Sequence, residues 1–257
     1  MCEIFGVSSK KVCQLNEYLS EFYSHSNAHP HGWGLACMEG VEVSIEKEPI
    51  QASKSKYLKE RLGVPILAST AFAHIRYATI GNVEYKNCHP YTWKSRSGRR
   101  WTLVHNGTVF DYPRLNEYVH IQHGDTDSER ILLYIVACMD QAEAKLGREP
   151  DARERFQILD NIFVDMSKGN KLNILIFDGE LFYVHTNYVN TLFKLEHDDQ
   201  TLFSTQPLSR EEWIPIEFNT LLAYQEGKEV FRGTDHGNEY IENEENLKFL
   251  YQVFAGL

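Results

Sequence analysis

Three absences narrow what this sequence of 257 residues encodes. The longest apolar run, Ile131 to Met139, is far shorter than the roughly 20 residues that a membrane-spanning helix needs. No basic and then apolar leader precedes Glu3, so we expect a cytoplasmic protein without membrane contact. Basic residues are few, because 26 Lys and Arg stand against 36 Asp and Glu, for a formal net charge of −10. This balance argues against a nucleic-acid-binding surface, which is usually basic.

Paired cysteines are missing as well. The five cysteines are Cys2, Cys13, Cys37, Cys88 and Cys138. Their number is odd and none forms a C-x-x-C motif, so we expect reduced thiols rather than a disulfide framework. A zinc site at His25, His29 and His31 is an alternative, but their spacing matches no common zinc pattern. We therefore expect no metal and no other cofactor.

Short apolar runs predict a chain rich in strands. We expect strands at residues 2–8, 34–38, 41–46, 66–77, 100–105, 172–178, 181–186, 192–196, 201–205 and 221–225. Helices are expected at residues 11–23, 127–146, 151–166 and 242–254. The clearest helix starts after a Thr126-x-x-Glu129 capping box and stops at Gly147. Strands in hairpin-like pairs with helices segregated between them predict α+β layers rather than a parallel βαβ sheet.

Cys2 is the candidate nucleophile. If Met1 is removed, the thiol and a free α-amino group lie on one residue, and the amine has an ordinary pKa of about 7.7–8.0. The amine can then accept the thiol proton directly or through a water, as an adjacent base does in other nucleophilic enzymes. A thiolate attacks carbonyl carbons, so hydrolysis of an amide through a thioester is the reaction class that Cys2 predicts.

Polar residues at the ends of other predicted strands complete a pocket. Asn106 and Gly107 offer a side-chain amide and an unobstructed backbone N–H to an oxyanion. Arg76, with the Thr79 hydroxyl beside it, can bind a substrate carboxylate, and Asp127 can bind an ammonium. Together these groups describe a pocket for glutamine or a γ-glutamyl compound.

Each of these residues also has a purely structural interpretation. Cys2 could be a buried strand cysteine, and Arg76 could form an ion pair with Glu129. The Asn106-Gly107 dipeptide is a turn signal, and Asp127 could serve only the helix dipole. A papain-like arrangement of Cys, His and Asn is a further alternative, but Cys2 heads an apparent strand rather than a helix.

The motifs resemble the class II glutamine amidotransferases. Met1-Cys2, Ala73–Thr79 (AHIRYAT), Val104–Gly107 (VHNG) and Thr126–Glu129 (TDSE) occur in that family's order, and the resemblance extends to about residue 230. His31–Gly34, residues 172–178 and Phe203–Leu208 are similar to the small stand-alone members of the YafJ type.

The resemblance implies a four-layer αββα N-terminal nucleophile sandwich with two stacked, mainly antiparallel sheets. It also implies one glutamine amidotransferase domain over residues 1–257. Carried over by position, Cys2 would be the nucleophile and Asn106 and Gly107 the oxyanion hole. Arg76, Thr79 and Asp127 would bind the α-carboxylate and α-amino groups of the substrate.

One position departs from the pattern, because Ile80 stands where many synthase-linked members have a histidine. We expect an enzyme that hydrolyses the side-chain amide of glutamine or a γ-glutamyl compound and works alone. One alternative is a glutaminase subunit that donates ammonia to a separate synthase. The other is a non-catalytic module that senses glutamine.

Overall fold

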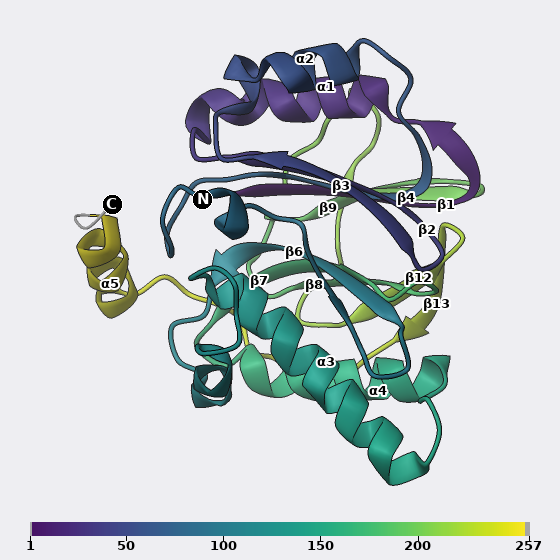
Figure 1. The fold of residues 1–257 in the computed structure, drawn as a ribbon, viewed down its shortest axis with the longest axis vertical. Coiled ribbons are helices and arrows are strands. Elements are labelled where there is room, and N and C mark those ends of the chain that lie inside the picture. Colours follow the sequence, from purple (N-terminus) through teal and green to yellow (C-terminus); the bar gives the residue numbers. More distant parts are fainter. Residues whose placement is uncertain (1, 255–257) are drawn as a thin grey trace.

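Two antiparallel sheets stacked face to face form the centre of the molecule, and the computed structural model describes residues 2–254 (Figure 1). Met1, on which the prediction of a processed N-terminus depends, lies outside the described residues. The first sheet has the strand order β11 (Ile214–Pro215), β9 (Phe193–His197), β10 (Gln200–Ser204), β1 (Glu3–Gln14), β4 (Leu67–Ile75), β2 (Trp33–Glu39), β3 (Glu42–Glu48). The second has the order β13 (Lys228–Arg232), β12 (Leu222–Gln225), β8 (Phe182–Thr186), β7 (Lys171–Phe177), β6 (Arg100–Thr108), β5 (Tyr91–Lys94).

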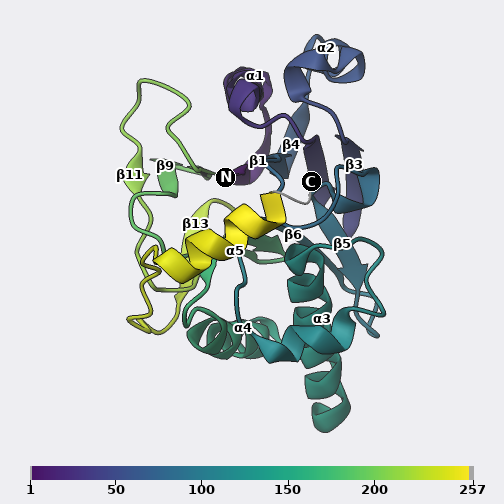
Figure 2. The ribbon, with the colours of Figure 1, turned by 90° about the vertical axis from the view of Figure 1, so that its left-hand side faces the viewer.

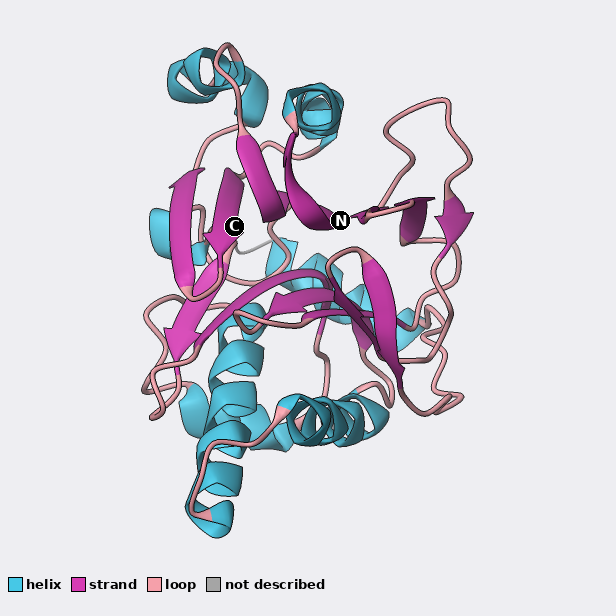
Figure 3. Cartoon of the chain, turned by 90° about the vertical axis from the view of Figure 1, so that its right-hand side faces the viewer, coloured by secondary structure: helices cyan, strands magenta, loops and turns pink. Residues whose placement is uncertain are grey.

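Helices cover the outer face of each sheet (Figures 1 and 3). The first sheet is covered by α1 (Asn16–Ser24) and α2 (Lys56–Leu62), and the second by α3 (Asp127–Leu146) and α4 (Ala152–Met166). The last helix, α5 (Glu244–Phe254), lies across the end of the sandwich where the N-terminus emerges (Figure 2). Short 3-10 turns occur at His25–Ala28, Ala52–Lys54, Tyr85–Asn87 and Pro113–Tyr118. The predicted α+β fold with four layers is confirmed.

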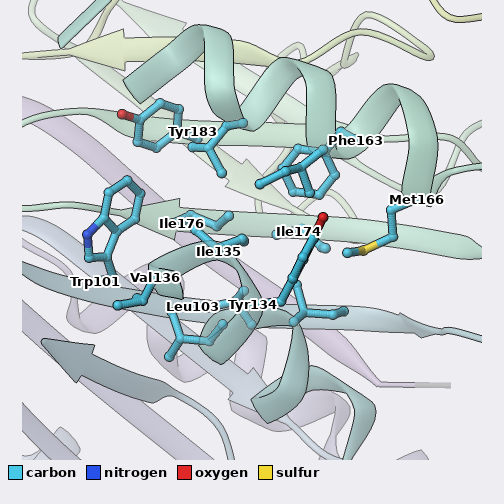
Figure 4. Close-up of a cluster of buried hydrophobic side chains, with 14 of the residues drawn as sticks. Trp101, Leu103, Tyr134, Ile135, Val136, Phe163, Met166, Ile174, Ile176 and Tyr183 are labelled. Carbon is cyan, nitrogen blue, oxygen red and sulfur yellow. The ribbon is translucent and has the colours of Figure 1, made fainter. Parts of the chain in front are cut away.

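Three buried clusters separate these four layers. One, partly shown in Figure 4, lies between the second sheet and α3 and α4. Another, which includes Phe5 and Leu19, lies between the first sheet and its helices. The third, which includes Ile4, Phe72 and Leu175, lies between the two sheets. Because successive strand residues point to opposite faces, each central strand contributes to two of these clusters.

The start of α3 differs in one detail from its prediction. The Thr126 hydroxyl accepts the expected hydrogen bond from the Glu129 N–H at 3.3 Å, and Gly147 ends the helix with a φ of 69°. The Glu129 carboxylate, however, accepts from the backbone N–H groups of His123 and Gly124 at 2.8 and 2.7 Å. It thereby holds the loop that leads into α3 instead of closing a capping box.

Two predicted boundaries are wrong because strands continue further than the apolar runs. β1 extends to Gln14, where we predicted a helix from Lys11, since Cys13 and Gln14 pair with β4 after a register shift. β6 continues through Asn106 and Gly107 to Thr108, so that dipeptide is not a turn. Within residues 2–254, no helix is both long and apolar enough to cross a membrane.

Candidate active site

Cys2 and Asn106 come from opposite halves of the sandwich. Ile4 of β1 belongs to the cluster between the sheets, and Cys2 lies two residues before it, directly ahead of that strand. On the opposing sheet Val104 belongs to that cluster, so Asn106 faces the first sheet. Both residues line one cavity of about 560 Å³, which we call the cysteine cavity.

The Cys2 thiol is held by the backbone of the loop that follows β4. Its Sγ lies 3.3 Å from both the N–H and the carbonyl oxygen of Tyr77. Burial raises the pKa of the Cys2 thiol, and the N–H of Tyr77 opposes that shift. The charge of Arg76 also lowers this pKa and that of Asp127 raises it, so both charges act on the sulfur.

Asn106 and Gly107 present unused polar groups at the end of β6. Asn106 is almost fully buried, and its Oδ1 has no hydrogen-bond partner among the described residues. Leu172 lies opposite Gly107 on β7. Its N–H donates to Asn187 Oδ1 at 2.8 Å, and its carbonyl oxygen accepts from the Asn187 N–H at 3.2 Å. Gly107 thus occupies a non-hydrogen-bonded position of the β6–β7 pair, and its N–H points away from β7. A Cβ at Gly107 would overlap the Lys171 carbonyl oxygen, so no larger residue fits.

Arg76 is buried and tied to the loop after β4. Its guanidinium donates to the carbonyl oxygens of Ile80 and Gly81 at 2.9 Å and of Asn82 at 2.8 Å. Thr79 lies half-buried in the same loop. The alternative ion pair between Arg76 and Glu129 is not formed among the described residues. The Glu129 carboxylate instead binds His123 and the backbone of the loop before α3.

Asp127 begins α3 and lies beside a different cavity. Its Oδ1 accepts from the Ser128 N–H and its Oδ2 from the Val109 N–H, both at 2.8 Å. With Ile80 and Gly81, Asp127 lines a space of about 330 Å³, which we call the aspartate cavity. The two cavities have no lining residue in common. The predicted site residues therefore fall into two groups, one around the sulfur and one around the first turn of α3.

Of the residues that line the cysteine cavity, the sequence analysis predicted Cys2 and Asn106 as site residues and did not place Glu3, His25 or Gln206 there. Glu3 is buried, and its carboxylate accepts from Gln206 Nε2 at 2.9 Å and lies 2.8 Å from Nδ1 of His25. The available signal was a carboxylate inside an otherwise apolar strand, directly after the candidate nucleophile. Nothing in the sequence indicated that Gln206, about 200 residues away, would contact it.

Comparison with known proteins gives a consistent family. The model of the family described as glutamine amidotransferases class-II matches residues 1–197. YafJ of Escherichia coli is 28% identical over 244 residues, which cover 84% of this chain and 94% of YafJ. The glutamine–fructose-6-phosphate aminotransferase of Streptococcus pyogenes is 36% identical over 137 residues, or 50% of this chain and 21% of that enzyme.

Solved structures show the same fold. A predicted glutamine amidotransferase from Pseudomonas aeruginosa superposes with a TM-score of 0.61 at 20% identity, over 90% of this chain and 100% of that one. The glutamine phosphoribosylpyrophosphate amidotransferase of Bacillus subtilis gives a TM-score of 0.64 at 17% identity, over 91% of this chain and 49% of that one. At these identities the likeness concerns the fold, which is the four-layer αββα sandwich of two antiparallel sheets.

Proposed function

The chain belongs to the class II glutamine amidotransferases, and we propose that Cys2 hydrolyses the side-chain amide of glutamine or of a γ-glutamyl compound. The observation that carries this proposal is the cysteine cavity, which both Cys2 and Asn106 line. A nucleophile and an oxyanion donor are the two groups that acyl transfer requires at one carbonyl.

The first step needs a thiolate and a base. Removal of Met1 frees the α-amino group of Cys2, which accepts the thiol proton, and the Tyr77 N–H at 3.3 Å stabilises the sulfur anion. The thiolate attacks the γ-carbonyl carbon and forms a C–S bond. Asn106 Nδ2 and the Gly107 N–H donate to the oxyanion. Collapse breaks the C–N bond, the leaving amine takes the proton, and water then hydrolyses the thioester to glutamate and free thiol.

The glutamyl end is recognised by charge. Asp127 binds the α-ammonium group from the aspartate cavity, because its carboxylate is fixed by two backbone N–H groups. Arg76 and Thr79 bind the α-carboxylate. The loop carbonyls of Ile80, Gly81 and Asn82 hold the guanidinium in place for this contact. We extend the proposal to residues 1–257 as one catalytic domain.

We favour an enzyme that works alone as a γ-glutamyl amidohydrolase. The near-complete coverage of YafJ and of the Pseudomonas aeruginosa protein supports this reading. The similarity to about one fifth of the Streptococcus pyogenes aminotransferase favours the alternative, an ammonia-donating subunit for a separate synthase. These readings differ in whether a partner protein accelerates glutamine turnover.

The test uses protein whose intact mass equals residues 2–257. We expect release of glutamate from glutamine and from γ-glutamyl amides, with some amide preferred over glutamine in kcat/KM. Cys2→Ala should abolish turnover but retain glutamine binding, whereas Cys37→Ala, a half-buried strand cysteine elsewhere, should remain active.

Three results would contradict parts of the proposal. Binding of glutamine without turnover by the processed protein indicates a sensor. Activity in protein that retains Met1 excludes the α-amino base. Turnover of glutamine alone, accelerated by an added partner protein, indicates the ammonia-donating subunit.

A further inference from the structure

The cysteine cavity is much larger than release of ammonia requires. Its volume is about 560 Å³, whereas a molecule the size of water needs roughly 10–15 Å³ of such space. The α-groups of a γ-glutamyl substrate are assigned above to Arg76, Thr79 and Asp127. The aspartate cavity beside Asp127 shares no lining residue with the cysteine cavity. The cysteine cavity is therefore free for whatever is joined to the γ-nitrogen.

Most residues that line this cavity have polar side chains, although carbon atoms form the larger part of its exposed wall. Apart from Cys2 and Ala28, every lining residue carries a carboxylate, an imidazole, an amide or a hydroxyl group. Thr191 and Thr205 contribute hydroxyls, and Asn190 contributes an amide. Such a lining offers hydrogen-bond partners to a polar leaving group and carbon surface to the alkyl chain that carries it.

The carboxylate of Glu3, which lines this cavity, is held in place by its neighbours. Glu3 lies next to the nucleophile in sequence, is 3% exposed, and is held by His25 at 2.8 Å and Gln206 at 2.9 Å. His29 Nε2 approaches the Oε1 of Glu3 at 3.7 Å. A carboxylate can accept about four hydrogen bonds, so these contacts leave acceptor capacity for a ligand.

We propose that the cysteine cavity is a leaving-group subsite, and that Glu3 selects a γ-glutamyl amide whose leaving amine carries a second, protonated amino group. This inference rests on the function proposed above. A diamine attached through one nitrogen would extend from the scissile bond along the cavity and donate its ammonium hydrogens to Glu3. The reaction is the hydrolysis already described, with the monoacylated diamine releasing a free diamine instead of ammonia.

A matched pair of substrates tests this selection. γ-Glutamyl-4-aminobutylamide carries the second amine, and γ-glutamyl-butylamide has the same length of carbon chain without it. We expect the processed enzyme to favour the aminobutylamide in kcat/KM by roughly tenfold or more, as a hydrogen bond to a buried charge provides. Glu3→Gln should reduce that ratio toward one.

The control variant is Glu21→Gln. Glu21 lies 3.7 Å from the Nε2 of the same His25 but is exposed and does not line the cavity. It should keep the wild-type ratio. Should Glu3→Gln fail to fold, inhibition of wild-type glutamine hydrolysis by free 1,4-diaminobutane and by uncharged 1,4-butanediol gives the answer without a variant, because the diamine should be the stronger competitive inhibitor.

The outcomes separate the two proposals. A wild-type enzyme that hydrolyses glutamine but treats both amides and both inhibitors alike overturns the subsite and leaves the hydrolase intact. An unchanged ratio in a folded Glu3→Gln variant overturns the role of Glu3. Absence of turnover with every substrate contradicts the proposed function itself.

Discussion

The direction of the Asn106 side chain depends on how far the strand β6 continues. Its side chain faces the first sheet because β6 continues through it, and its Oδ1 has no partner within the described residues. The pattern Val104–Gly107 suggested an oxyanion donor, but a turn was an equally ordinary interpretation of Asn-Gly. The decisive fact is pairing with β7, which a single apolar run does not reveal.

Asn106→Ala should therefore lower kcat for glutamine by about 10²–10³ with little change in KM, because the donor acts mainly on the oxyanion. Steady-state kinetics on processed protein measures both constants. Asn173→Ala is the matched control, since Asn173 lies directly opposite on β7, is equally buried and bonds Thr186 and Thr191 instead. An equal loss of kcat in both variants would assign the effect to packing.

Arg76 has contacts that suit two roles, and one substitution distinguishes them. Arg76→Lys should mainly raise KM for glutamine if the guanidinium binds the substrate carboxylate, because an ammonium does not reproduce a planar fork. If Arg76 only holds the loop carbonyls of residues 80–82, thermal stability should fall while KM stays constant. Glutamine kinetics and a melting curve on the same preparation decide between them.

At the scale of elements, long periodic segments were predicted well and short ones were not. The 20 residues of α3 match the predicted range, because repeated apolar positions and both end signals agree. The four-residue β5 and the seven-residue α2 were missed, since segments of that length carry little periodicity. The cysteine cavity was not predictable in full for the same reason, because His25 lies in a 3-10 turn and Gln206 in a loop.

Among the side chains of α5 that the structure describes, one lines the aspartate cavity. Phe249 lines it and packs edge-on against Phe110, with ring centroids 5.7 Å apart. Phe249→Ala should raise KM for glutamine about fivefold, which corresponds to roughly 1 kcal/mol of lost contact. Leu247→Ala is the control, because Leu247 is equally exposed, at 39%, but does not line the cavity. An unchanged KM for Phe249→Ala would mean that α5 does not contribute to substrate binding.

At the scale of the whole molecule, Lys171 connects the second sheet to the C-terminal segment. Its Nζ lies 3.4 Å from the centre of the Tyr188 ring and 3.8 Å from the Glu242 carboxylate, and the side chain is 4% exposed. Burial lowers the pKa of Lys171 to about 8, although Glu242 opposes the shift. Protonation of this amine therefore favours the unfolded chain, in which the ordinary pKa of about 10.4 applies.

The consequence is a pH-dependent stability with a defined sign. Between about pH 8 and pH 10.4 the unfolded state binds more protons at this position, so the free energy of unfolding should rise with pH relative to Lys171→Met. Urea titrations of both proteins across that range measure the difference. Lys168→Met, an exposed lysine three residues earlier, should show the wild-type trend. If the free energy of unfolding changes with pH in the same way for wild type and Lys171→Met, titration of Lys171 does not contribute to stability.

The strand order of the first sheet also has a consequence for how the molecule is made. β1 lies between β4 and β10, and Phe5 pairs with Ser204. During synthesis β1 therefore precedes β10, the strand that covers its second edge, by nearly 200 residues. In the processed enzyme proposed above, an aminopeptidase would act at Met1 while this segment is still open on that edge, and the sandwich would then close around the trimmed terminus.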